Sequence, residues 1–224
     1  MLYRKIGIEL CSCTLKAFIS GGCKEFPVGG FAELRDTEIL HQITSAVEYL
    51  HSNNICHQNL NPSNILISRP DGTLYPRIKL TDFAFTRVSA TASLSLWKRV
   101  GANKSWVAPE IYDCYTFDLA MDVFPLGILF AYVLSGGVHP FGADKEDRIF
   151  NIKKKQPMSF TIQHLNGVAG AADVFDLICS MLSFDPEERP MASAVLNVIG
   201  ILTSESCDSK SKGKMLHSFY KSIV

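Results

Sequence analysis

The chain of 224 residues lacks an excess of charge of either sign, because its 22 lysines and arginines balance its 22 aspartates and glutamates. A neutral chain lacks the basic surface that attracts nucleic acids and anionic lipids. It also lacks a long apolar run, since the longest, residues 123–134, is well short of the ~20 residues that cross a bilayer. We therefore expect no nucleic-acid partner and no membrane segment in this chain.

The seven cysteines lack the spacing of a metal site or a disulfide framework. Cys11 and Cys13 are one residue apart, which is too close for the usual CxxC arrangement. The first residues, MLYRKIGIELC, lack the long apolar run and small-residue cleavage site of a signal peptide. These features are typical of a cytoplasmic protein with reduced thiols.

The sequence contains several stretches with helical periodicity and one short pair of predicted strands. Residues 33–52 carry apolar side chains at three- and four-residue spacings, which predicts a helix with one buried face. Three further helices are predicted over residues 121–137, 174–184 and 191–202. Two short strands, residues 65–68 and 77–82, enclose a Pro-Asp-Gly turn and predict the hairpin, and residues 3–10 also read as a strand. The fold class expected is α+β, mainly helical.

The longest stretch without a regular pattern runs from Ala84 to Asn103 and is rich in serine and threonine. A long irregular segment inside a compact domain is usually functional or mobile. Its hydroxyl groups are candidate phosphorylation sites with basic residues nearby, but we favour a solvated polar loop. The last residues, 204–224, form a polar tail that we do not expect to pack.

Five short motifs follow one another along this framework. They are HQNLNPSN from His57, DFA from Asp82, APE from Ala108, an apolar helix opened by Asp122, and DPEERP with Arg189. In this order they resemble the C-terminal lobe of eukaryotic protein kinases, whose loops read HRDLxxxN, DFG and APE. The stretches GIELCSCTLKAFI, HSNNICHQNLNPSNILIS, KSWVAPE and GGVHPFG are similar to the inositol-requiring stress-sensor kinase/endoribonucleases and to the related oligoadenylate-dependent ribonuclease.

The resemblance implies three segments. Residues 1–13 would contain the end of the last N-lobe strand and the hinge, residues 14–203 the kinase-like C-lobe, and residues 204–224 the tail. The Gly-rich loop and the lysine of an N-terminal lobe have no counterpart here. We therefore expect either a fragment of a longer protein or a lobe with an incomplete nucleotide cleft. We do not expect RNA cleavage by this chain.

The catalytic loop implied by the resemblance is degenerate. Asn59 takes the place of the aspartate that accepts the substrate proton, and an amide cannot take up a proton near neutral pH. Loss of a general base typically costs about 10²–10⁴-fold in rate. Asn61 takes the place of a lysine that contacts the transferring phosphate. Gln58 takes the place of an arginine that ties the loop to a phosphorylated segment.

The positions that the resemblance assigns to nucleotide and metal are better preserved. Asn64 and Asp82 match the residues that hold Mg²⁺, and oxygen ligands suit this ion. Glu9 and Cys11 match the hinge beside the adenine, and Leu66 matches the apolar floor beneath it. The alternatives are a loop-capping amide at Asn64, a turn former at Asp82 and a core residue at Leu66.

The resemblance further implies a structural ion pair between Glu110 and Arg189 and a helix-start anchor at Asp122. Three functions remain open. The first is a pseudokinase that binds ATP and Mg²⁺ weakly or not at all and serves as a docking or self-association module for a protein partner. The second is an active serine/threonine kinase. The third is part of a stress sensor, on the cytosolic side of the endoplasmic reticulum, whose kinase domain positions a ribonuclease.

Overall fold

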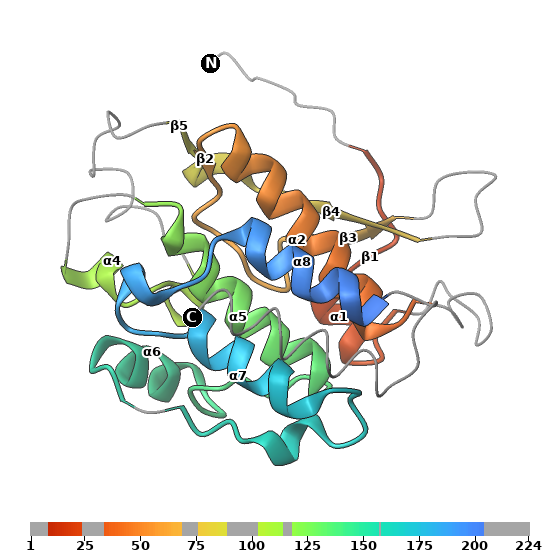
Figure 1. Ribbon diagram of the computed structural model, residues 1–224. Coiled ribbons are helices and arrows are strands. Elements are labelled where there is room, and N and C mark those ends of the chain that lie inside the picture. Colours follow the sequence, from red (N-terminus) through yellow and green to blue (C-terminus); the bar gives the residue numbers. More distant parts are fainter. Residues whose placement is uncertain are drawn as a thin grey trace.

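A computed structural model describes residues 9–23, 34–68, 76–88, 103–113, 118–156 and 158–203. Most of the predicted strand at residues 3–10 lies outside these ranges, as do the Pro-Asp-Gly turn, the serine-rich part of the irregular segment and the tail. The helices form one body, and short strands lie along one side of it (Figure 1). In the described ranges, no helix has both the length and the apolar character needed to span a membrane.

The predicted first long helix is confirmed as α2 (Asp36–Ser52). Its periodic apolar side chains are completely buried: Ile39, Leu40, Ile43 and Val47. Figure 1 shows α2 lying beside α8 (Ala192–Thr203), which covers part of this apolar face. The side chain of Gln42 on α2 accepts a hydrogen bond from the backbone N–H of Ile78 (2.9 Å) and so joins the helix to the hairpin.

The predicted hairpin is confirmed as β3 (Ile65–Ser68) paired antiparallel with β4 (Arg77–Leu80). A two-residue strand, β1 (Cys13–Thr14), pairs with the other edge of β3 and leads directly into α1 (Leu15–Ile19). The hydroxyl of Thr14 caps α1 by accepting a hydrogen bond from the N–H of Ala17 (3.1 Å). These two elements are too short for a periodic pattern to predict them.

The irregular segment begins later than predicted. After the 3₁₀ turn η1 (Phe83–Phe85), the chain forms β5 (Arg87–Val88), which pairs antiparallel with β2 (Ile55–Cys56). Each of these strands has only two residues, so neither shows the alternation by which strands are predicted. Their pairing fixes the direction in which the chain leaves the DFA motif.

The C-terminal half is helical, as predicted. Its elements are α4 (Glu110–Asp113), α5 (Ala120–Leu134), α6 (Lys145–Lys153), the turn η3 (Ile162–Leu165), α7 (Ala171–Met181), the turn η4 (Pro186–Glu188) and α8. Buried residues occupy almost every position of α5, which explains why its sequence is apolar all round. Gly127 lets α5 approach α7 closely, because a Cβ atom there would lie 2.9 Å from the Cβ of Met181.

The histidine of the GGVHPFG motif forms a buried polar contact between two loops. His139 is 2 % exposed, its Nε2 atom donates to the carbonyl of Ser105 (2.8 Å), and its Nδ1 atom accepts from the N–H of Phe141 (3.2 Å). Burial, helped by the nearby positive charge of Arg148, lowers the pKa of His139 to about 3. The neutral ring therefore ties the start of the APE segment to the loop after α5.

Candidate functional site at the loop between α2 and β3

The loop is anchored from behind by Asp122, which is fully buried at the start of α5. Its carboxylate accepts hydrogen bonds from the backbone N–H groups of His57 (2.6 Å) and Gln58 (2.8 Å), and from Nε2 of His51 (3.2 Å). Burial alone would raise the pKa of Asp122, but the contact with His51 and the two backbone donors lower it below its ordinary value. The ionised carboxylate therefore fixes the loop backbone to α5.

His57 connects this loop to the end of β4. Its buried ring donates from Nε2 to the carbonyl of Thr81 (3.1 Å) and accepts at Nδ1 from the N–H of Asn59 (3.2 Å). The pKa of His57 is lowered, chiefly by burial. Its edge also contacts the ring of Phe83, with centroids 5.0 Å apart. A neutral imidazole with the proton on Nε2 satisfies both polar contacts.

The amide of Asn59 faces the aspartate of the DFA motif. Its Nδ2 atom donates to Oδ2 of Asp82 at 2.8 Å. A carboxylate can only accept, so this contact requires the nitrogen of Asn59 to face Asp82 and turns its Oδ1 towards Asn61 (3.3 Å). Asp82 itself has φ of 62° and ψ of 66°, the left-handed conformation that few residues other than glycine adopt. No motif or spacing in the sequence indicated this contact.

Two further amides brace the same backbone. Asn61 is 3 % exposed; its Nδ2 donates to the carbonyl of Asn59 (2.9 Å) and its Oδ1 accepts from the N–H of Ser63 (3.0 Å). Nδ2 of Asn64 donates to the same carbonyl of Asn59 (2.9 Å). Both polar ends of the Asn61 side chain are therefore hydrogen-bonded within the loop, and Asn64 has a loop-capping contact through its nitrogen. Its Oδ1 accepts no hydrogen bond from any described residue.

Magnesium would find few ligands in this loop. In the part of the chain that the structure describes, no group of three or more histidine, cysteine, aspartate or glutamate side chains is suited to a metal. Asp82 offers one carboxylate, half engaged by Asn59, and Asn64 offers an amide oxygen. Mg²⁺ is commonly held by one or two carboxylates with nucleotide phosphates completing its shell. The residues present fit Mg²⁺ only as a weak site of that kind.

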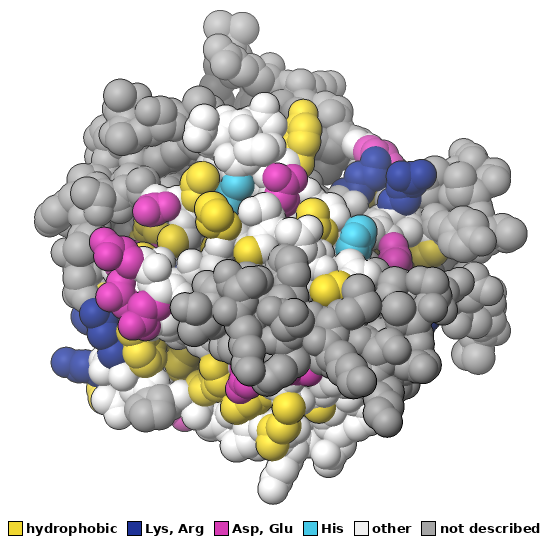
Figure 2. Space-filling model, viewed as in Figure 1, with side chains coloured by type: hydrophobic (Ala, Val, Ile, Leu, Met, Phe, Trp, Pro, Cys, Tyr) yellow, Lys and Arg dark blue, Asp and Glu magenta, His cyan; other side chains and the backbone are white. Residues whose placement is uncertain are grey.

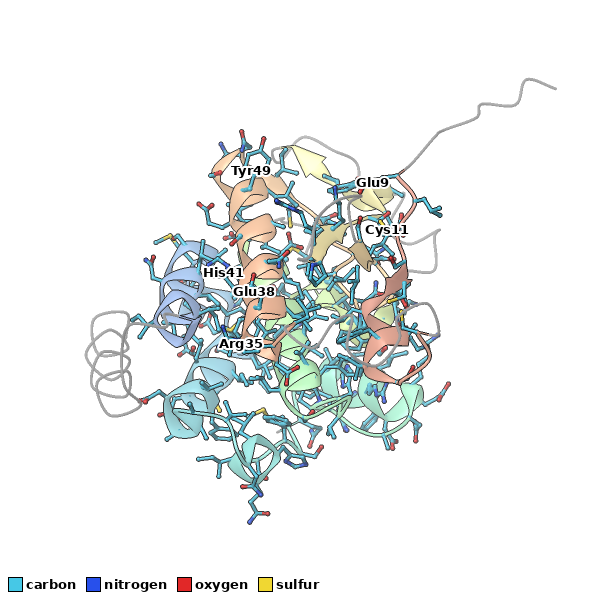
Figure 3. The ribbon with its side chains drawn as sticks, turned by 90° about the vertical axis from the view of Figure 1, so that its right-hand side faces the viewer. Glu9, Cys11, Arg35, Glu38, His41 and Tyr49 are labelled. Carbon is cyan, nitrogen blue, oxygen red and sulfur yellow. The ribbon has the colours of Figure 1, made fainter. Side chains whose placement is uncertain are left out.

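The residues matched to the hinge lie beside the hairpin (Figure 3). The carboxylate of Glu9 binds Nζ of Lys79 (2.7 Å) and the hydroxyl of Ser68 (3.0 Å), and its pKa is lowered first by the Lys79 contact. The thiol of Cys11 donates a weak hydrogen bond to the carbonyl of Glu9 (3.8 Å). Leu66 is half-buried on β3. The Glu9 side chain thus holds this segment to the hairpin.

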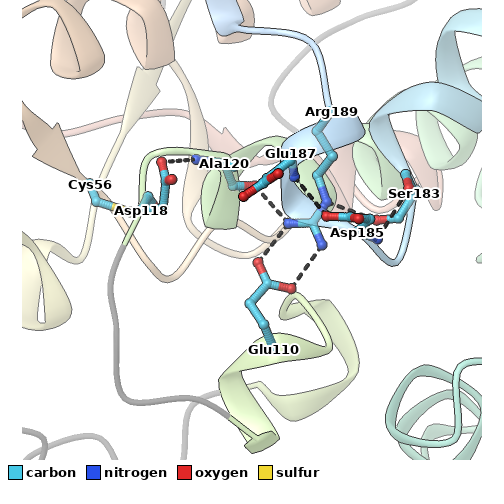
Figure 4. A network of polar contacts seen from close by, with 8 residues as sticks. All are labelled: Cys56, Glu110, Asp118, Ala120, Ser183, Asp185, Glu187 and Arg189. Carbon is cyan, nitrogen blue, oxygen red and sulfur yellow. Dashed lines mark hydrogen bonds and ion pairs between the residues drawn. The ribbon is translucent and has the colours of Figure 1, made fainter.

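Glu110 and Arg189 form a bidentate ion pair (Figure 4). The two guanidinium nitrogens donate to the two carboxylate oxygens at 2.6 and 2.8 Å. Arg189 is 6 % exposed and also donates to the carbonyls of Ser183 (2.8 Å) and Ala120 (2.9 Å). Its carbon Cζ lies 5.1 Å from the centre of the Phe124 ring. The pair joins α4, α5 and the turn before α8.

Two features of the loop were not anticipated from the sequence. His51 completes the contacts of Asp122, although a histidine in the last turn of a helix carries no signal of that role. Gln58 has a left-handed backbone (φ 64°) and is 5 % exposed, and neither its Nε2 nor its Oε1 has a hydrogen-bond partner in the described structure. A buried amide without partners costs about 1–3 kcal/mol, so this position is strained as well as uncharged.

Comparisons with known proteins agree with the motif order. A family model described as the protein kinase domain matches residues 5–198. The serine/threonine-protein kinase/endoribonuclease IRE2 of Homo sapiens is 35% identical over 200 residues, which cover 87% of this chain and 21% of that protein. The kinase/endoribonuclease ire-1 of Caenorhabditis elegans is 30% identical over 207 residues, 91% of this chain and 21% of that protein. The chain therefore spans about a fifth of the length of these relatives.

Proposed function

The chain belongs to the protein kinase family, within which it is related to kinase/endoribonucleases, and we propose that it is a pseudokinase. In this proposal it binds ATP and Mg²⁺ weakly or not at all, transfers no phosphate, and acts as a docking or self-association module for a protein partner. The observation that carries the proposal is the hydrogen bond from Asn59 to Asp82, because it joins the two positions at which kinases perform their chemistry.

The missing base supports the absence of phosphate transfer. An active kinase needs an acceptor at the position of Asn59 that orients the substrate hydroxyl and takes its proton. Asn59 presents a donor towards Asp82 and turns its oxygen to Asn61, and its amide cannot take up a proton near neutral pH. Asn61 supplies no positive charge to the transferring phosphate and is held within the loop. Both changes remove stabilisation of the transition state and leave the fold intact.

The well-bonded frame behind the loop supports a binding role. Asp122 keeps three hydrogen-bond contacts, and Arg189 keeps its two carbonyl contacts and the ion pair with Glu110. These contacts hold the surface of the domain in one arrangement without requiring catalysis. A rigid surface of this kind suits recognition by a protein partner or by a second copy, because little conformational entropy is lost on binding.

Phosphate transfer by the 224-residue chain tests the proposal directly. With ATP and Mg²⁺ at high protein concentration, we expect neither ADP release nor autophosphorylation above the level of the Asp82→Ala variant. Turnover that Asp82→Ala abolishes would establish an active kinase and overturn the proposal. Asn59→Asp is the informative partner variant, since a gain of turnover on restoring the carboxylate assigns the defect to this position.

A second candidate role comes from the printed names of the relatives, which join a kinase to an endoribonuclease. In a longer protein of that arrangement, this domain would position a ribonuclease on the cytosolic side of the endoplasmic reticulum, and loss of phosphate transfer would be tolerable. The test is whether the coding sequence continues into a transmembrane segment upstream and a ribonuclease downstream. Absence of both from the complete transcript would remove this role.

A further inference from the structure

A pocket of about 410 Å³ opens on the side of the molecule behind the loop. It lies between the end of α2, the start of α5 and the start of α8, and none of the residues matched to nucleotide or metal lines it. Its volume is at the small end of the ~300–1,000 Å³ range of small-molecule sites. On the face drawn in Figure 2, apolar, acidic and histidine side chains lie close together over these elements.

The lining carries uncompensated negative charge. Glu48 on α2 and Asp118 before α5 both line the pocket, and no cationic group among the described residues is within ion-pair distance of either. Among the described residues, the Asp118 carboxylate accepts a hydrogen bond only from the backbone N–H of Ala120 (3.1 Å) (Figure 4). The pocket's one arginine, Arg189, has its charge offset by the bidentate contact with Glu110. A positively charged group would therefore be attracted to this pocket.

The rest of the lining is apolar and partly open to solvent. Pro190 and Val123 are buried in the wall, and Leu119 and Pro186 are half-buried. Met191 is 75 % exposed, an unusual exposure for a large apolar side chain. Methionine adapts its shape to a ligand more easily than branched side chains do. An apolar body would bury this surface while its cationic end reaches the carboxylates.

Two side chains, His51 and Asp122, connect the pocket to the loop. His51 lines the pocket, and its Nε2 contacts Oδ2 of the buried Asp122 at 3.2 Å. Asp122 in turn accepts the backbone N–H groups of His57 and Gln58. A ligand that displaces the His51 ring therefore changes the contacts of the carboxylate that holds the loop.

We propose that this pocket binds a small organic cation with an apolar body, such as an arylamidinium or alkylammonium ion, and that the ligand acts on the loop through His51. The cation is held by Glu48 and Asp118, and the apolar body lies against Met191 and its neighbours. The site is separate from the nucleotide positions, so it does not depend on whether the domain binds ATP.

Benzamidine is a suitable probe, because it joins a planar cation to an aromatic ring, and benzoate is its matched anion. We expect benzamidine to cause saturable chemical-shift changes in ¹H–¹⁵N spectra of the full chain at residues around the pocket, and at the amides of His57 and Gln58. Benzoate should cause none of these. Equal responses to both probes, or changes elsewhere only, would overturn the site.

Carboxylate variants locate the cation. Glu48→Gln and Asp118→Asn should each weaken benzamidine binding about two- to fivefold, the range of exposed ion pairs. Asparagine at position 118 can still accept the hydrogen bond from the N–H of Ala120, so the fold is kept. Glu146→Gln on α6 removes the same charge far from the pocket and should leave affinity unchanged. Equal affinity in all three variants contradicts the proposal, and shifts that never reach His57 or Gln58 refute the link to the loop.

Discussion

The two sides of the loop at residues 57–64 are held by different kinds of contact. On the buried side, the charged carboxylate of Asp122 is fully buried and accepts hydrogen bonds from two backbone N–H groups and from His51. On the open side, the exposed carboxylate of Asp82 meets one neutral amide, that of Asn59. The departures from the kinase pattern lie in the loop itself, at Gln58, Asn59 and Asn61, whereas Asp122 and its contacts with the loop backbone are kept.

Energetics account for this difference. Removing one partner of a buried charged contact leaves the other desolvated and unpaired, which typically costs about 3–5 kcal/mol. Replacing a group at an exposed position usually changes stability by less than about 0.5 kcal/mol. Asn59 is only partly buried, and the buried amide of Asn61 is satisfied by contacts within the loop, so amides can take these places while the frame behind them stays intact. A kinase fold can therefore lose chemistry without losing structure.

The largest effect is expected from breaking the buried side. Asp122→Ala leaves two backbone N–H groups and His51 without an acceptor, and should lower the free energy of unfolding by about 3–5 kcal/mol. Asp122→Asn keeps one acceptor and should cost less. Urea unfolding followed by circular dichroism measures both. The open-side control, Asn59→Ala, removes one partly exposed contact, and a loss as large as that of Asp122→Ala would erase the contrast between the two sides.

The sequence predicted the framework well because it rests on periodic patterns. Repeated apolar residues over stretches of eleven or more residues predicted the helices α2, α5, α7 and α8. A turn between two short apolar runs predicted the hairpin. The missed elements are those without such a pattern. The strands β2 and β5 have two residues each, and only Ile152 of the polar helix α6 is buried. Their pairing and packing depend on the rest of the fold.

For the candidate site, the sequence predicted which residues to consider and did not predict the hydrogen bonds between them. Motif order located Asp122, Asn59 and Asp82, since each occupies a fixed place in the kinase pattern. The contact between Asn59 and Asp82 depends on a left-handed backbone at Asp82 and on the return of the chain through the hairpin, since the two residues are 23 positions apart. No local pattern encodes that distance. The same holds for His51, whose partner Asp122 is 71 residues away.

An intermediate effect is expected from acid, which acts on another buried contact, that of His139 with the carbonyl of Ser105. His139 has its pKa lowered to about 3 in the folded protein, whereas an unfolded histidine binds its proton near pH 6.5. Between these values the unfolded state holds more protons, so stability is present above about pH 6.5 and falls as pH falls, by ~1.4 kcal/mol per pH unit. Unfolding free energies measured from pH 7 to pH 5 should fall, and the slope should approach this value below about pH 5.5.

His139→Gln separates this contribution from other acid effects. Glutamine can still donate to the carbonyl of Ser105, but it cannot titrate. The variant should be less stable than the natural chain at pH 7 and lose less stability on acidification. His57, whose pKa is also lowered by burial, keeps its own contribution in both proteins. Parallel pH profiles for the two proteins would show that His139 is not a source of the acid sensitivity.

The smallest effect, and the one that probes the open side, is expected from Asn59→Asp. The new carboxylate would lie where an amide donor now stands 2.8 Å from Asp82, and two like charges at a solvated position repel by roughly 1 kcal/mol. Stability should therefore fall slightly in a metal chelator and recover on addition of Mg²⁺, which two carboxylates bind better than one. Thermal unfolding with and without Mg²⁺ measures the change.

Asn59→Ala separates the charge from the lost hydrogen bond. It removes the donor to Asp82 without adding a carboxylate, so it should lose a similar or smaller amount of stability and show no recovery with Mg²⁺. If Mg²⁺ stabilises Asn59→Ala and Asn59→Asp equally, the ion binds independently of position 59. The amide of Asn59 would then not be what separates this loop from a metal-binding one. If Mg²⁺ stabilises only Asn59→Asp, the single change from aspartate to asparagine at position 59 explains why this side of the loop binds an amide in place of a metal ion.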